Sequence, residues 1–438
     1  MRRILLTLVA FLLVAPAAQA QNERPYLEIS DPNFRAYPLA IPEFKDLGQG
    51  SGAKAAATGL QTLRFDLSLT GVFNLLDPRS FLVNPKQEGL TGASINFANW
   101  INVGAEGLIK IGMLKSGTEL TLDCHLFDVA SGRELLAKKY NGPEKTIRRM
   151  MHRWADAVVR HYTNTPSIFA TRITFTKRTK KGKAIGILDF DGHNERYLVK
   201  NGSLNLLPGW GPGGTIYYSS YLRGGPHLYR HDLATKKNKV ISRAKGLNIG
   251  VSGSPNGKYM AFTSSRDDNS EIYRIAPDGS GAIRLTRHWA IDSSPAWSPD
   301  SKRIAFVSER SGNPQIYAMN ADGSGVKRLT FQGNYNQTPD WSPSGEWILF
   351  NARDERLVYD IFKINPATGE IRRLTQDQGN NEHPSFSPDG NLVVFSSTRT
   401  GESKLYVMNA DGSNQRLISR GKGEYTTPEW GPWTEVKQ

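Results

Sequence analysis

Short apolar runs recur at a fixed spacing through the second half of the chain. Within a repeat such as 297–342, β-branched and aromatic residues form four runs, separated by turn signals such as Asp322-Gly323. Each repeat also carries a Pro-containing turn, usually after a tryptophan or phenylalanine. The turn prolines, spaced 43 to 45 residues apart, are Pro212, Pro255, Pro299, Pro343, Pro388 and Pro432. A period of this length with four strands predicts a β-propeller.

The two ends of the repeat array are each incomplete. The strand-like run 172–176 has no inner strand before it, whereas 427–430 reads as an inner strand with no strand after it. Pairing these two runs gives six four-stranded blades in a closed ring, which removes the exposed sheet edges. A two-sheet sandwich would not explain a period that is held over six copies.

Residues 21–165 lack the repeat and predict a separate α/β domain, with the propeller over 166–438. Apolar residues at helical spacing predict helices over 53–69 and 147–162, and alternation predicts strands over 103–113 and 120–129. The run 39–44 is also strand-like, and Pro42 within it favours an edge position.

The first twenty residues predict a secretory signal peptide. Arg2 and Arg3 precede an apolar run over 4–14, and small residues end at Ala20, after which we expect cleavage. This run is shorter than the ~20 residues that a membrane-spanning helix needs, and no later stretch reaches that length. We therefore expect export to the periplasm. The single cysteine, Cys124, excludes an intramolecular disulfide framework.

The formal charge of +14 is concentrated in one part of the chain. Residues 172–245 hold 15 basic and 4 acidic residues, most densely over 177–183. This segment fits a solvated loop, a contact for an anionic partner or lipid headgroups, or a nucleic-acid site. A nucleic-acid site would usually add exposed aromatic residues or a groove-entering helix. Because the aromatic residues occupy repeat positions that the core needs, we expect no nucleic-acid partner.

Motifs for catalysis, cofactors and metals are weak. The chain has no Gly-x-Ser-x-Gly elbow, and the glycine-rich segment 48–54 lacks the Gly-Lys-Ser/Thr of a phosphate loop. The eight histidines are scattered, and Asp267-Asp268-Asn269 is more typical of a polar loop than of a cation site. We expect no enzyme activity, cofactor or metal. The alternative is a secreted propeller hydrolase or lyase with two carboxylates in its tunnel.

Two sets of polar residues keep the same register in successive repeats. An asparagine or aspartate lies five positions before the turn aromatic, with Tyr425 as the exception, and an arginine follows each second strand. Because strands alternate in direction, both sets share one face, at the tunnel mouth. They either support loops and bridge blades or accept a partner's peptide or loop. The partner-binding candidates are Asn205, Asn248, Asp292, Asn336, Asn381, Arg266, Arg310, Arg353 and Arg399.

Several segments resemble one known family. The repeat text, with Trp297-Ser298-Pro299-Asp300 and 316–323 (IYAMNADG), resembles the propeller repeat of the TolB family of the Tol–Pal system. More specific are 69–77 (LTGVFNLLD), Asn99-Trp100 and 169–173 (FATRI). An α/β domain ahead of six blades, behind a signal peptide, fits the same family. Gly253 departs from the pattern, since it replaces the turn aromatic, and we expect it to loosen the third blade.

The resemblance implies a periplasmic scaffold without enzyme activity. A member of this family is expected to bind the lipoprotein Pal across the tunnel mouth, and TolA through the mature N-terminus, roughly Gln21 to Pro32. It would support outer-membrane integrity and invagination during cell division. We expect a monomer that meets the membrane only through its partners.

Overall fold

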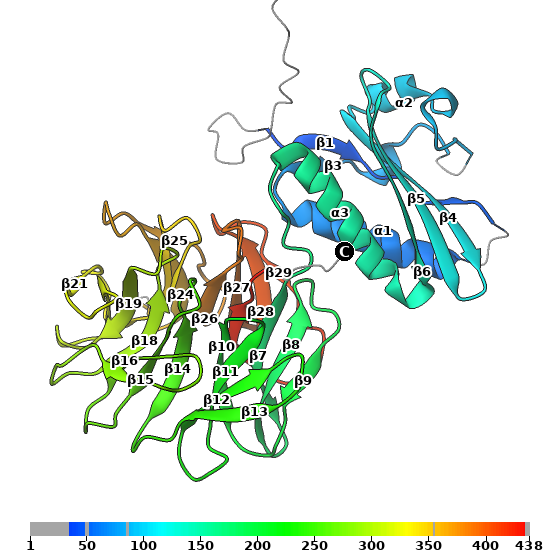
Figure 1. The fold of residues 1–438 in the computed structure, drawn as a ribbon. Helices are drawn as coiled ribbons and strands as arrows, with labels where there is room; N and C mark the ends of the chain where they lie inside the picture. Colours follow the sequence, from blue (N-terminus) through cyan, green and yellow to red (C-terminus); the bar gives the residue numbers. More distant parts are fainter. Residues whose placement is uncertain (1–34, 49–51, 85–86, 354, 434–438) are drawn as a thin grey trace, which may run out of the picture.

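The computed structural model describes residues 35–48, 52–84, 87–353 and 355–433. An α/β domain precedes a β-propeller and packs against one side of it (Figure 1). The predicted signal peptide over 1–20 and the segment from Gln21 to Pro32 lie outside the described residues. Among the helices of the described part, none is long and apolar enough to cross a membrane.

The α/β domain is built on one mixed sheet in the order β3-β1-β4-β5-β6, with β2 paired to β4. The strands β1, β3 and β4 run parallel, and β4, β5 and β6 follow as antiparallel neighbours. The bounds are β1 Tyr37–Ala40, β2 Lys45–Asp46, β3 Phe73–Leu75, β4 Gly107–Ser116, β5 Glu119–Asp128 and β6 Glu134–Pro143; α1 Ala53–Leu69, α2 Phe97–Asn102 and α3 Ile147–Thr163; and one-turn helices Pro78–Ser80, Gly92–Ser94 and Glu144–Thr146.

Alternation along the strands divides the core of this domain between two faces of the sheet. Ile109 and Ile111 point to the face covered by α1 and α3, where Leu63 and Trp154 are fully buried. Leu108 points to the other face, which α2 and the loops around it cover. The amphipathic helices therefore pair with the sheet as their apolar spacing predicts.

The sequence-based elements of this domain are largely confirmed. The helix over 53–69 has the expected bounds, the helix over 147–162 is α3, and the two alternating runs are β4 and β5. The edge position inferred for 39–44 is wrong. Pro42 lies between β1 and β2, outside both strands, and β1 lies inside the sheet between β3 and β4. The strand β6 was not predicted, because most of its residues are exposed or half-buried and its apolar and polar residues do not alternate clearly.

Six four-stranded sheets form the propeller, as the period of the sequence predicts. Inner strands contact the inner strands of neighbouring blades. From inner to outer strand, the blades are β10 Asn205–Gly211, β11 Thr215–Ser220, β12 His227–Asp232, β13 Asn238–Ser242; β14 Asn248–Gly253, β15 Met260–Ser264, β16 Glu271–Ile275, β17 Ile283–Arg284; β18 Asp292–Trp297, β19 Arg303–Ser308, β20 Gln315–Asn320, β21 Lys327–Arg328; β22 Asn336–Trp341, β23 Ile348–Arg353, β24 Tyr359–Ile364, β25 Ile371–Arg373; β26 Asn381–Phe386, β27 Leu392–Thr400, β28 Glu402–Asn409, β29 Arg416–Leu417; and β30 Tyr425–Trp430, β7 Arg172–Thr179, β8 Gly182–Asp189, β9 Arg196–Val199.

The last blade closes the ring with the C-terminal strand, as expected. The inner strand β30 pairs antiparallel with β7, so that Trp430 lies opposite Ile173. Every inner strand also carries a bulge just after its second residue. The third residue of each inner strand has a positive φ, and in five of six blades a proline follows it. These residues are Leu207, Gly250, Ser294, Thr338, His383 and Thr427.

The blade of β14 to β17, the third when the blade that contains β7 is counted first, is closely packed where its aromatic residue is missing. A Cβ atom on Gly253 would lie 2.7 Å from the backbone oxygen of Trp210 in the preceding blade. The backbones of the two blades therefore approach each other here more closely than a larger residue would allow. This contact does not support the looser blade expected from the sequence.

The two domains share a continuous apolar core. Phe169, Phe190 and Leu392 of the propeller side belong to the same buried cluster as Leu63 and Trp154. Next to this contact lies a groove of about 560 Å³, lined by residues that include Leu69, Val159, Phe169, Leu392 and Trp433. None of the residues singled out from the sequence as partner-binding candidates lines this groove.

Candidate partner-binding site at the propeller mouth

The mouth is the propeller face formed by the loops that precede the inner strands and by the loops between second and third strands. The first residue of each inner strand pairs with the end of a second strand, as Asn205 does with Ser220 and Asp292 with Ser308. This confirms that the two sets of polar residues share a face. The α/β domain contacts Asp191, in the turn between β8 and β9, and Arg416, at the start of β29, both at the opposite ends of the strands. The mouth therefore lies on the face away from that domain.

The asparagines and the aspartate of the mouth are fully buried rather than presented to solvent. Asn248 and Asn336 donate from Nδ2 to the carbonyl oxygens four residues earlier, both at 2.8 Å. The Oδ1 of Asn205 accepts from Ser220 at 2.7 Å, which ties the inner strand to the second strand. These bonds fix the loops before the inner strands, which is the supporting role that asparagine often has in loops.

Three of the arginine candidates repeat one arrangement. Arg266, Arg310 and Arg399 each donate from Nε to a serine two residues earlier, at 3.1, 2.8 and 2.9 Å. Each also reaches the buried residue that begins the inner strand; Arg310 is 2.7 Å from Asp292 Oδ2, and Arg399 is 3.0 Å from Asn381 Oδ1. The arginines thus link strands within a blade, and Arg266 also bridges to the preceding blade by donating to Ser242 Oγ at 3.2 Å.

Arg353 differs in having Asn351 in place of the serine two residues earlier. Like the other three guanidinium groups, its own lies over aromatic rings, here Tyr335 and Tyr359 at 4.9 and 5.3 Å from the ring centroids. It therefore holds an aromatic residue of the mouth in place. The structure assigns the candidate residues a role in shaping the mouth. Direct contact between these residues and a partner stays a prediction.

Exposed apolar side chains on the mouth loops were missed by the sequence analysis. Trp289, Phe331 and Leu357 are 79%, 72% and 68% exposed, and Ile291 and Tyr335 are also exposed. We call these five residues the mouth apolar patch. Their signal in the sequence is that they lie between strands, outside the repeat positions that fill the core. Exposed aromatic residues of this kind are typical anchors of protein interfaces.

The loops that carry the patch are held in fixed conformations. Asn269 donates from Nδ2 to the carbonyl oxygens of His288 and Ala290, at 2.8 and 3.0 Å, on both sides of Trp289. Gln315 donates to the carbonyl oxygen of Gly333, in the loop that carries Phe331. A binding surface on ordered loops loses less conformational entropy when a partner docks.

The basic segment 177–183 also lies at the mouth, and part of its charge is used internally. The Lys177 ammonium is buried, donates to Tyr425 and Glu195 at 2.5 Å each, and so takes the place of the asparagine network in the closing blade. Arg178 pairs with Glu424 at 3.2 Å. Lys180 and Lys181 are exposed and leave a local positive charge at the rim.

Carboxyl groups do meet near the propeller axis. Burial raises the pKa of Asp340 to about 7, and burial together with the charge of Asp340 raises the pKa of Glu429. Burial lowers the pKa of the nearby His383 to about 4. Asp340 Oδ2 accepts from the backbone N–H of Phe386 at 2.7 Å, a bond between blades that Ser252 and Ser385 make at the equivalent positions. This gives Asp340 a structural role, so the carboxyl pair does not favour the hydrolase or lyase alternative.

A possible cation site lies elsewhere, between the domains. Asp66, His152 and Asp191 bring one ligand atom each within 4.8 Å of one another. However, the carboxylates contact different nitrogens of the His152 ring, and the Arg148 guanidinium is bonded to Asp191. The positive charge that a metal would supply is already present, so these residues do not fit a metal ion well.

The fold and the mouth together define a two-domain, six-bladed β-propeller protein with an apolar patch on ordered loops. Family models described as the TolB amino-terminal domain and the TolB beta propeller domain match residues 25–135 and 159–434. The chain belongs to the TolB family of the Tol-Pal system.

Relatives and a solved structure agree with this assignment. Tol-Pal system protein TolB of Anaeromyxobacter dehalogenans is 46% identical over 98% of this chain and 99% of its own. The protein of the same name from Myxococcus xanthus is 45% identical over the full length of both chains. The crystal structure of TolB from Acinetobacter baumannii is 28% identical, with a TM-score of 0.78 over 93% of this chain and 100% of that chain.

Proposed function

We propose that the chain is a periplasmic scaffold without enzyme activity, in which the propeller mouth binds the lipoprotein Pal. Membership of the TolB family supports a role in the Tol-Pal system. The observation that carries the proposal is the mouth apolar patch, which lies on ordered loops of the face away from the α/β domain. Apolar anchors near the centre of an interface, surrounded by charged groups, are the usual pattern of a protein-binding surface.

Calorimetry with a soluble form of Pal tests this proposal. The double variant Trp289→Ala, Phe331→Ala should weaken binding at least tenfold, since truncated interface anchors typically cost about 2 kcal/mol or more each. A matched control is Ile283→Ala, because Ile283 is also exposed but lies on the outer strand β17. Unchanged affinity in the double variant would show that the mouth apolar patch is not the Pal site.

The buried candidate residues are less suitable for this test. Asp292 is fully buried and paired with Arg310, so the variant Asp292→Lys would disturb the loops as well as any partner contact. The exposed patch can be changed without opening the blades, because Trp289 and Phe331 contribute little to the core.

We propose in addition that the mature N-terminus, roughly Gln21 to Pro32, binds TolA, so that the chain links two envelope proteins during outer-membrane invagination. The assignment to a family of the Tol-Pal system supports this proposal, in which the α/β domain spans 21–165 and the propeller spans 166–438. A pull-down from envelope extract with and without 21–32 tests it. Both forms should recover Pal, and only the longer form should recover TolA; recovery of TolA by both forms would refute this part.

A further inference from the structure

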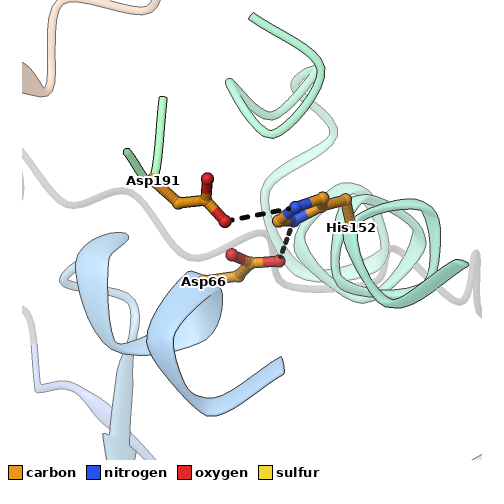
Figure 2. Close-up of side chains that lie close together, drawn as sticks. All are labelled: Asp66, His152 and Asp191. Carbon is orange, nitrogen blue, oxygen red and sulfur yellow. Dashed lines mark hydrogen bonds and ion pairs between the residues drawn. The ribbon is translucent and has the colours of Figure 1, made fainter. Parts of the chain in front are cut away.

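A buried cluster of ionisable side chains joins the two domains at the face away from the mouth. Asp66 lies on α1 and His152 on α3, whereas Asp191 lies in the turn between β8 and β9 of the propeller (Figure 2). The side chains of Asp66, Asp191 and His152 are 0%, 1% and 11% exposed. A cluster of this kind, between elements far apart in the sequence, couples its protonation to how the domains sit together.

His152 lies between the two carboxylates and contacts both of them. Its Nδ1 is 2.7 Å from Asp66 Oδ2, and its Nε2 is 3.3 Å from Asp191 Oδ2 (Figure 2). A neutral imidazole donates from one nitrogen only and would direct a lone pair at a carboxylate oxygen on the other side. Only the contact with Asp66 is a hydrogen bond, but a carboxylate on each side of the ring favours one proton more than the neutral ring and two carboxylates would carry.

The charges around this cluster balance only with that proton. Arg148, on α3, donates to Asp191 and to Thr62 and supplies one positive charge. From the propeller side, Arg420 acts on the cluster from farther away, and the pKa of His193 is lowered to about 4 by burial and by Arg148. Burial raises the pKa of Asp66 against the opposing effect of His152, and Asp66 Oδ1 has no hydrogen-bond partner. Loss of the proton would leave two buried carboxylates with one adjacent cation.

Aromatic side chains pack next to the ionisable cluster, at the contact between the two domains. Phe190, next to Asp191, is fully buried and lies 5.3 Å from the His152 ring and 6.3 Å from the Phe65 ring. The propeller therefore inserts an adjacent apolar and an acidic side chain between α1 and α3. A change in the His152 contact acts directly on the segment that fixes the two domains together.

We propose that Asp66, His152 and Asp191 form a pH-sensitive latch between the domains, closed while a protonated His152 lies between the two carboxylates and weakened when that proton is lost. The latch holds the α/β domain in one orientation at mildly acidic pH. As the pH rises and the proton leaves, repulsion between Asp66 and Asp191 favours separation of the propeller turn from α1. This inference does not depend on the proposed partners.

Distance measurements between the domains test the latch. Spin labels are placed on Lys138→Cys in the α/β domain and Lys237→Cys in the propeller, both exposed, while the buried Cys124 stays unlabelled. Pulsed electron paramagnetic resonance should give a narrow distance distribution at pH 5.5 and a broader one at pH 8.5. The ratio of the narrow to the broad component should fall about tenfold, which corresponds to ~1.4 kcal/mol.

Three variants distinguish a pH-sensitive latch from a contact that only stabilises the fold. His152→Gln should give the broad distribution at both pH values, and Asp191→Asn should reduce the broadening at high pH, because no second carboxylate remains to repel Asp66 when the proton leaves. His125→Gln is the matched control, since His125 also lies between two carboxylates, Asp123 and Glu134, but within the α/β domain alone. It should behave like the unmodified protein.

Two results would overturn the proposal. One is a distance distribution that does not change with pH in the unmodified protein, or that stays pH-dependent in His152→Gln. If His152→Gln does not fold, the smaller pH response expected for Asp191→Asn carries the test, and a response as large as that of the unmodified protein refutes the latch. The other is a narrow distribution that appears only with added Zn²⁺ and is lost with a chelator, which would make the cluster a metal site instead.

Discussion

Replacing Asp340 with asparagine would test the physical account of the propeller centre. Asparagine has nearly the shape of aspartate and keeps an oxygen that accepts the backbone N–H of Phe386, a bond of 2.7 Å between neighbouring blades. The variant therefore removes the ionisable group and leaves the bond. Any difference that depends on pH reports the cost of ionising a carboxyl group at this position.

The sign follows from the direction of the pKa shift. Burial raises the pKa of Asp340 from 3.8 to about 7, so the folded protein takes up a proton that the unfolded chain has already released in this pH range. The free energy of unfolding then falls as the pH rises from about 4 to 7 and levels off above 7. At 1.36 kcal/mol for each pKa unit, the full effect is at most about 4 kcal/mol. Asp340 is only partly buried, which makes this value a ceiling.

Urea unfolding at pH 5 and pH 8.5, followed by tryptophan fluorescence, measures the effect. Relative to the unmodified protein, Asp340→Asn should gain about 1 to 3 kcal/mol on going from pH 5 to pH 8.5, because only the two units between pH 5 and the pKa of about 7 contribute, at ~1.36 kcal/mol each. Asp300→Asn is the control, because a hydrogen bond from Ser298 lowers the pKa of Asp300, so it stays ionised throughout this range. An equal pH response in the two variants, or a loss of stability in Asp340→Asn that grows with pH, would refute the reasoning.

Three further predictions concern packing and burial. Gly253→Ala should lower the free energy of unfolding by about 1–3 kcal/mol, because its Cβ would press against the backbone of Trp210 2.7 Å away; equal stability in thermal unfolding would contradict this. Arg310→Ala should cost about 3–5 kcal/mol by leaving Asp292 buried without its cation, and adding Asp292→Asn should restore most of the loss in chemical unfolding. Cys124 is buried and its pKa is raised, so a thiol reagent should modify it only after unfolding; rapid modification of the native protein would show that β5 opens.

The sequence predicts the architecture well because the repeat is a property of local spacing. Six copies of one turn and four runs define blade number, and the unmatched runs at 172–176 and 427–430 show how the ring closes. The helix over 53–69 follows from apolar spacing alone. The position of Pro42 was predicted wrongly. It lies in the connection between β1 and β2 and does not indicate a strand at the edge of the sheet.

The direction of side chains at the mouth was less predictable. The register of the repeat placed Asn205 and its counterparts on the correct face. The bulge after the second residue of each inner strand, where the third residue has a positive φ, cannot be predicted from a hydrophobic pattern. The contact of Asp66 and His152 with Asp191 depends on how two domains pack, and no spacing in the sequence encodes it. Trp289 and Phe331 lie outside the repeat positions that fill the core, and this is the feature of the sequence that predicts their exposure.

Hydrogen exchange of the mature protein with and without soluble Pal tests the central claim most directly, because it reports every loop at once. The account predicts that Pal protects amides over 286–292 and 331–336, which carry the mouth apolar patch, and leaves the outer strand β17 unchanged. Protection confined to the face that packs against the α/β domain, or no protection on the propeller, would contradict the assignment of the mouth as the binding surface.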